Sequence, residues 1–189
     1  MKQETKKRIA KLREYTQKFE ENPKDIPLDI RQDLQVMWAS VFTEFVDFAE
    51  LGMRFLGFSI TEQQKDIARY MQSCPNRAMV QAQRGESKST LAALFGVWNE
   101  VQDPSYRVLI VSAGGSQASD VAKLMIGMIE HWDILCWLRA DKRRGDRTSY
   151  EEYDTNSALH KLEKSASITC IGITGNLQGK RADLLIPDD

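Results

Sequence analysis

The chain has 189 residues, of which 42% are hydrophobic, enough for one compact domain with a small appendage. Lys and Arg total 26 against 27 Asp and Glu, a net charge of −1, so the chain is not a globally basic nucleic-acid binder and any DNA contact must come from a local patch. The three cysteines stand far apart, no zinc-ligand spacing occurs, and no apolar run has signal-peptide or membrane-spanning character. We therefore expect a soluble cytoplasmic protein with reduced thiols.

The N-terminal part of the chain is predicted to be helical. Residues 1–22 are charged, with apolar residues spaced for one face of a short amphipathic helix. From Asp29 the apolar residues recur at intervals of three and four, which predicts one long helix ending near Gly52. We interpret residues 1–57 as a helical region that packs or docks, and residues 58–189 as the unit that carries the chemistry.

The remainder of the chain alternates between strand and helix patterns. Strands separated by helices of this length predict an α/β fold with a mostly parallel sheet covered on both faces. The polar segment 139–157 shows no clear period. The helices are expected over residues 61–73, 88–99 and 116–132, and the strands over residues 77–81, 107–112, 167–173 and 183–186.

The segment Ala82-Gln83-Arg84-Gly85-Glu86-Ser87-Lys88-Ser89 has the character of a phosphate-binding loop. Such a loop reads G-x-x-x-x-G-K-[ST] between a strand and a helix; its backbone N–H groups attract phosphates, the lysine reaches the terminal phosphates and the hydroxyl holds magnesium. Ala82 and Ser87 replace the two glycines, and Ser87 costs more than glycine if its φ must be positive. Glu86 is expected to point to solvent. An exposed helix start with a solvated lysine remains an equal alternative.

An acidic turn closes the sequence pattern. The aliphatic run 184–186 leads through a proline into Asp188 and Asp189. In nucleotide-hydrolysing proteins the first acid of such a turn binds the water shell of the metal, and a second acid polarises the attacking water. Acidic turns are also common on surfaces, but the order of this turn after the loop favours nucleotide binding.

Gln64 precedes the loop and has two interpretations. A glutamine amide offers a donor and an acceptor together, which suits the edge of adenine. Thr61 and Gln64 also form a T-x-x-Q capping box, which explains the glutamine without any ligand.

Three further segments are candidates for the edge of the site. The small residues of 112–118 follow a strand, and the glycine-rich segment 172–183 suits a tight loop beside a phosphate or a DNA strand. The basic run 139–147 is either a DNA-backbone contact or a solvated loop.

Together these residues resemble the ATPase domain of the large terminase subunit of tailed bacteriophages, in the branch found in short-tailed phages. That branch shows Q-A-x-R-G-x-x-K-S, matched by residues 81–89, and a V-S-A turn, matched by residues 111–113. It also shows G-I-T-G-x-L-x-G-x-R-A-D before an aliphatic strand and two aspartates, matched by residues 172–183 and 188–189. The resemblance covers about residues 60–189 and implies a three-layer P-loop NTPase fold.

The resemblance also implies the cofactors ATP and Mg²⁺ and a role for each site residue. Arg84 would act as an arginine finger in cis, Gln64 would read adenine, and Ser89 and Asp188 would hold the metal. The catalytic residues would be Arg84, Lys88, Asp188 and Asp189. The nucleotide would be bound by Gln64, Gly85, Glu86, Ser87, Lys88, Ser89 and Thr90.

In the family this domain drives double-stranded DNA into a capsid in the host cytoplasm, as a homo-oligomeric ring on the portal protein with the small terminase subunit. On that basis we expect the sheet to be incomplete after the acidic strand and the nuclease domain to be absent. A helicase-type ATPase is one alternative, although the G-I-T-G block disfavours it. A non-catalytic assembly module with a degraded phosphate loop is the other.

Overall fold

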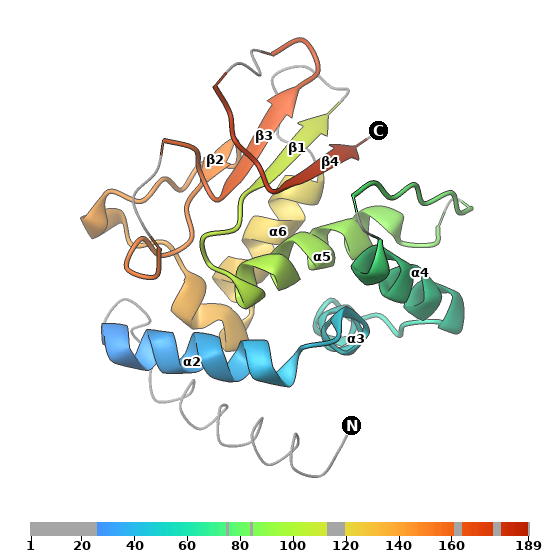
Figure 1. The fold of residues 1–189 in the computed structure, drawn as a ribbon, viewed down its shortest axis with the longest axis horizontal. Coiled ribbons are helices and arrows are strands. Elements are labelled where there is room, and N and C mark those ends of the chain that lie inside the picture. Colours follow the sequence, from blue (N-terminus) through green and yellow to red (C-terminus); the bar gives the residue numbers. More distant parts are fainter. Residues whose placement is uncertain are drawn as a thin grey trace.

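The computed structural model describes residues 26–74, 76–83, 85–112, 120–160, 164–175 and 179–188, and it contains a mixed four-stranded sheet. The strand order is β2-β3-β1-β4, and β1 pairs in parallel with both β3 and β4 (Figure 1). The predicted α/β class is confirmed. The short β2 pairs antiparallel with β3, inside the segment for which the sequence predicted no regular element. The strands are β1 (Val108–Ser112), β2 (Glu152–Tyr153), β3 (Ile168–Gly172) and β4 (Leu184–Asp188).

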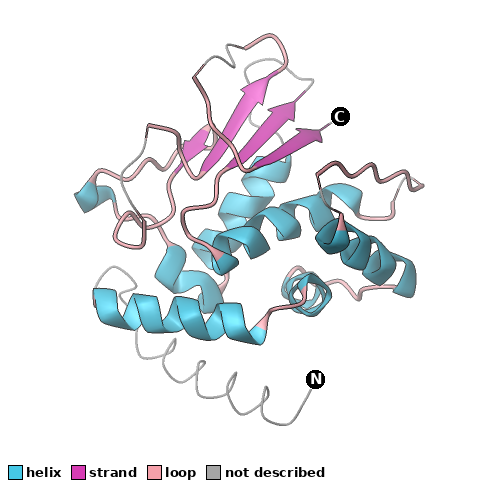
Figure 2. Cartoon of the chain, in the orientation of Figure 1, coloured by secondary structure: helices cyan, strands magenta, loops and turns pink. Residues whose placement is uncertain are grey.

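The described helices gather on one side of this sheet (Figure 2). Leu184 and Ile186 of β4 face them and pack against the core, whereas Leu185 points to the other face and is 56% exposed. The second helical layer expected of a three-layer fold is therefore not present in the part of the chain that the structure describes. The helices are α2 (Leu28–Val41), α3 (Phe45–Phe55), α4 (Glu62–Ser73), α5 (Lys88–Gln102) and α6 (Asp120–His131), with 3₁₀ turns η2 (Asp133–Leu138) and η3 (Lys142–Arg144).

One hydrophobic core joins the N-terminal helices to the sheet. Phe45 of α3 packs edge-on against Phe95 of α5, with ring centroids 5.0 Å apart. Phe48 contacts Trp132 beyond α6, with centroids 5.4 Å apart. Each such side chain contributes about 1.5–3 kcal/mol by leaving water. Residues 26–57 thus share a core with α5 and α6. No helix within the described ranges is long and apolar enough to cross a membrane.

The single long helix predicted for the N-terminal part is wrong: two helices, α2 and α3, take its place. The carbonyl of Phe42, where α2 ends, accepts hydrogen bonds from Trp98 Nε1 at 2.7 Å and from Gln102 Nε2 at 2.8 Å. The N–H of Phe45, where α3 begins, donates to Gln72 Oε1 at 2.7 Å. Side chains of α4 and α5 therefore satisfy the backbone groups that the break releases, which the apolar period could not indicate.

The strand predicted over residues 77–81 is also wrong. These residues pair with no strand in the described structure, and Met79 is 77% exposed. Strand β4 forms one edge of the sheet, and the N–H of its Leu184 donates to the backbone carbonyl of Arg107, just before β1. Because backbone groups alternate along a strand, Pro187 faces away from β1, where its missing N–H costs no bond of the ladder. A short apolar run predicts a strand only where a partner edge receives it.

Candidate nucleotide-binding site

The loop that leads into α5 contains two residues with positive φ. Gly85 has φ of 100°, which glycine adopts readily. Ser87, the N-cap of α5, has φ of 55° and ψ of 32°, the left-handed region. A non-glycine residue there costs about 1–2 kcal/mol. Ser87 stands where phosphate loops carry a glycine. Its φ is positive, which is the condition under which serine was expected to cost more than glycine.

Lys88 turns back into the loop. Its ammonium donates to the carbonyl oxygens of Ala82 at 2.7 Å and Gln83 at 3.1 Å. Within the loop, the N–H of Glu86 donates to the carbonyl of Gln83 at 3.3 Å. The described hydrogen-bond acceptors of Lys88 are thus neutral, so its charge is available to an anion. Glu86 is half-buried, less open than expected, and Arg84 lies outside the described residues.

The first turn of α5 adds a second attraction for anions. The Ser87 side chain makes no capping hydrogen bond, and the first turn holds no acidic residue. The free N–H groups and the dipole of a helix N-terminus favour negative charge. Ser89 is exposed and Thr90 is half-buried in this turn. The loop, Lys88 and the helix start therefore form a site that can hold a phosphate.

Gln64 lies against this loop and is 6% exposed. The capping box is present, since Gln64 Oε1 accepts the Thr61 N–H at 2.9 Å and the Gln64 N–H donates to Thr61 Oγ1 at 3.3 Å. In addition, Gln64 Nε2 donates to the carbonyl of Glu86 at 3.5 Å. The structure therefore brings the glutamine and the loop together although they are separated in sequence.

The carboxyl ends of the three parallel strands meet at one edge. Ser112 of β1 is in register with Gly172 of β3 and with Asp188 of β4. Beyond Gly172 the chain turns tightly: the N–H of Gly175 donates to the Gly172 carbonyl at 2.7 Å, and a Cβ on Gly175 would lie 3.0 Å from that oxygen. A side chain there would require the Gly172 carbonyl to shift by a few tenths of an ångström, so glycine suits this turn. The side chains of Ser112 and Asp188, all of Asp189, and residues 113–119 lie outside the described part.

Asp183, the last residue of the G-I-T-G…R-A-D block, has a structural contact that the sequence did not indicate. Its Oδ2 accepts the Arg107 N–H at 2.9 Å, and its own N–H donates to the Arg107 carbonyl at 2.9 Å. These bonds align the start of β4 with the start of β1. The acidic turn is thereby delivered to the carboxyl edge of the sheet.

Three cations of the basic run are engaged in ion pairs, and the longest of these joins Arg139 to Asp133 at 3.9 Å. Arg147 binds both carboxylate oxygens of Asp154, at 2.8 and 2.9 Å, and Arg143 contacts Asp141 at 3.1 Å. Burial alone would raise the pKa of Asp154, but the ion pair and hydrogen bonds with Arg147 outweigh it and lower that pKa below its ordinary value. The run is therefore a partly neutralised loop, and it carries less unbalanced positive charge than its sequence indicates.

Glu100 is a buried acid that the sequence analysis missed. It lies on the buried face of α5 with no exposed surface, near Arg107 and Thr155. Burial raises the pKa of its carboxyl well above the ordinary value, and the charge of Arg107 opposes that rise. Glu100 lies one residue beyond the helix predicted over residues 88–99, and its helical spacing of three from Val97 was the available signal.

The parallel strands, the positive-φ loop and the inward-turned lysine define an α/β protein with a loop at a helix start whose charge and geometry suit an anion. The chain is 36% identical over 149 residues to the terminase large subunit of Enterobacteria phage T3, a match that covers 77% of this chain and 25% of that protein. No family model matches. At this identity the chain belongs to the terminase large-subunit family, and it spans about a quarter of the length of the relative it matches.

Proposed function

We propose that this chain is the ATP-hydrolysing motor module of a phage DNA-packaging terminase, with a P-loop NTPase fold. The observation that carries the proposal is the position of Lys88, whose ammonium lies inside a positive-φ loop at the start of α5. A triphosphate offers this cation charged oxygens in place of neutral carbonyls, and charge-assisted hydrogen bonds are roughly twice as strong as neutral ones. The relationship to a terminase large subunit supports the choice of ATP.

Each residue of the site then has a defined part. Lys88 and the N–H groups from Gly85 to Thr90 bind the phosphates, and Arg84 stabilises the charge that develops on the transferred phosphoryl group. The exposed Ser89 hydroxyl and the Asp188 carboxylate fit the oxygen ligands that magnesium requires. Mg²⁺ supplies neutralisation of phosphate charge, and Asp189 orients the water that attacks.

The partners follow from the same proposal. Double-stranded DNA is the polymer moved, the portal protein and the small terminase subunit are the docking partners, and a ring of identical subunits is the working form. Of the basic run, Lys142 and Arg144 are exposed cations outside the described ion pairs and are the best placed to meet a phosphate backbone.

Lys88→Ala tests the proposal directly. A hydrogen bond to a charged group is worth about 1.5–3 kcal/mol, so magnesium-ATP affinity should fall by about 10- to 150-fold. Lys123→Ala is the control, because Lys123 is a half-exposed cation on α6 whose described ion pair is with Asp120. Titration calorimetry giving the same ATP affinity for the Lys88 variant, or no ATP binding by the wild type, would favour the non-catalytic assembly module.

A further inference from the structure

Both ends of the Gln64 amide are engaged within the protein. Its oxygen accepts the N–H of Thr61 in the capping box of α4, and its nitrogen donates to the carbonyl of Glu86 in the loop. The side chain is almost fully buried. Gln64 thus joins the first turn of α4 to a residue two positions before Lys88.

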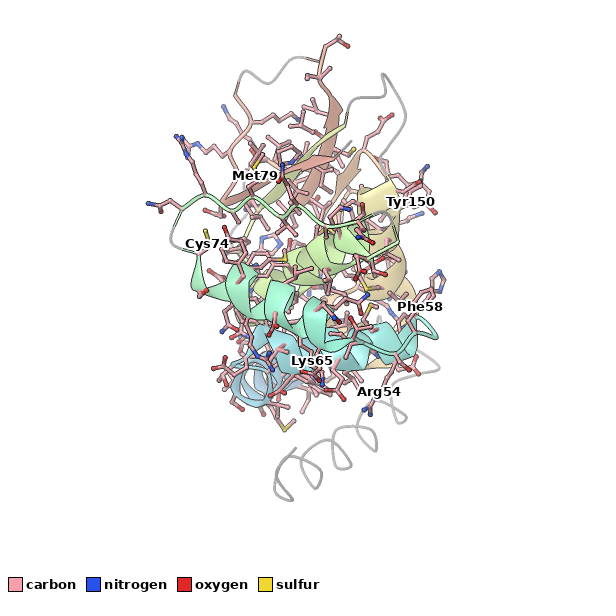
Figure 3. All side chains as sticks on the ribbon, turned by 90° about the vertical axis from the view of Figure 1, so that its right-hand side faces the viewer. Arg54, Phe58, Lys65, Cys74, Met79 and Tyr150 are labelled. Atoms are coloured by element: carbon pink, nitrogen blue, oxygen red, sulfur yellow. The ribbon has the colours of Figure 1, made fainter. Side chains whose placement is uncertain are left out.

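The loop has few other attachments to the body of the protein. After α4 ends, the chain runs back above that helix, from the side of Cys74 past Met79 (Figure 3). Cys74 Sγ donates to the Arg77 carbonyl at 2.7 Å near the beginning of this path. The bond of Glu86 to the Gln83 carbonyl is internal to the loop, and those of Lys88 join residues 82 and 83 to the first residue of α5, the helix that the loop enters. Among the described residues 78–86, the hydrogen bond from Gln64 is the one that attaches the loop to an element other than α5, the helix that the loop enters.

We propose that Gln64 is a positioning residue for the phosphate loop, in addition to any contact it makes with a base. By holding the Glu86 carbonyl, it fixes the peptide that precedes Ser87 and so aims the N–H groups of the α5 first turn. This inference rests on the proposed function, because it assigns Gln64 a share of phosphate binding. The roles are compatible: a primary amide has two N–H donors and two acceptor lone pairs, and the described bonds use one of each.

Three variants separate the contacts of Gln64. Gln64→Glu retains an oxygen for the Thr61 N–H but cannot donate to Glu86 when ionised. Gln64→Met is uncharged and of similar length, so it loses both bonds without placing a carboxylate near the phosphates. Thr61→Ala is the matched control, because it removes the hydroxyl that accepts the backbone N–H of Gln64 and leaves the hydrogen bond from Gln64 Nε2 to the Glu86 carbonyl in place.

Calorimetric titration of the full chain with magnesium and inorganic tripolyphosphate, ATP and GTP measures the effect. Tripolyphosphate has no base, so a base contact contributes nothing to its affinity. Loss of one neutral hydrogen bond corresponds to about a twofold to tenfold change. We expect both Gln64 variants to bind tripolyphosphate weaker by that factor, and Thr61→Ala to bind it like the wild type.

The outcomes are distinguishable. Gln64 variants that keep tripolyphosphate affinity and lose the preference for ATP over GTP would make Gln64 a base reader and overturn the positioning role. A wild-type chain that binds neither tripolyphosphate nor ATP would overturn both the proposed function and the share of phosphate binding assigned to Gln64. Hydrogen exchange of the ligand-free protein tests the contact separately: Gln64→Met should speed exchange at residues 85–88 and Thr61→Ala should not, and equal exchange would refute the attachment.

Discussion

Ser87 is strained in the ligand-free loop, and Ser87→Gly should relieve that strain. Its φ of 55° costs a side-chain-bearing residue about 1–2 kcal/mol. Glycine removes this cost but loses about 0.5–1 kcal/mol through the greater freedom of the unfolded chain. The net gain in the free energy of unfolding should lie between about 0 and 1.5 kcal/mol, and each kcal/mol corresponds to about 2–4 °C in Tm for a chain of this size.

Two control variants isolate the backbone effect. Ser87→Ala removes the hydroxyl and keeps the strain; because the Ser87 side chain makes no capping bond, it should leave stability nearly unchanged. Gly85→Ala imposes the opposite change. Its φ of 100° disfavours a side chain, yet a Cβ there would meet no atom within 4 Å. The destabilisation of about 1–2 kcal/mol should therefore be conformational rather than steric.

Urea and thermal unfolding of the wild type and the three variants are the assay. Ser87→Gly should be the most stable of the four and Gly85→Ala the least. Equal stabilisation by Ser87→Ala and Ser87→Gly would show that the side chain, and not φ, is responsible, and destabilisation by Ser87→Gly would refute the strain. Since Ser87 has positive φ without ligand, the relief is common to free and bound states, so ATP affinity should change less than stability.

Three further predictions concern the body of the protein and the basic run. Gly52→Ala should destabilise by about 1–3 kcal/mol, because its Cβ would clash with the buried side chain of Leu94 in α5. Gly127→Ala, with open space on α6, should stabilise by about 0.5–1 kcal/mol, and urea unfolding curves of both variants check the pair. Glu100→Gln should raise Tm at pH 7–8 and leave it unchanged near pH 4. An acid whose pKa is higher in the folded protein than in the unfolded chain costs stability only at pH values above the pKa of the unfolded chain. A lower Tm of the variant at neutral pH would instead show that Glu100 is ionised and paired with Arg107. Replacing Lys142 and Arg144 with alanine should reduce the log–log salt slope of DNA binding by about 1.8, and an unchanged slope would place the DNA contact elsewhere.

The elements with strong periodic signals were predictable from sequence. The helix expected from residue 88 is α5, and the runs from 107 and 167 gave β1 and β3, in the parallel order that alternating helices imply. What sequence could not supply were decisions made by distant contacts. The break after α2 depends on side chains of α4 and α5, and the unpaired segment 77–81 depends on which edge the sheet presents.

The candidate site divides in the same way. Loop chemistry is local, so the positions of Lys88 and of the positive-φ residues follow from their order along the chain. The approach of Gln64 to Glu86 joins segments 22 residues apart, and local sequence left its capping and ligand roles open. Arg143 and Arg147 look like free cations in sequence because their acidic partners are identified only by folding. A run of basic residues is therefore a less reliable predictor of a binding surface than the positions of glycine and lysine are of a phosphate loop.

The ligand-free loop already has a defined conformation, so a phosphate would not have to order it on binding. Ser87 holds its left-handed conformation, Gln64 holds Glu86, and Lys88 is folded inward on two carbonyl oxygens. Binding must break the hydrogen bonds of Lys88 to those neutral carbonyl oxygens. A ligand is therefore favoured only if it offers Lys88 stronger hydrogen-bond acceptors. A triphosphate supplies several charged oxygens to one ammonium and to the first turn of α5, whereas a singly charged anion replaces two carbonyls with one weak partner. The conformation of the loop therefore favours polyphosphates over simple anions before any base is read.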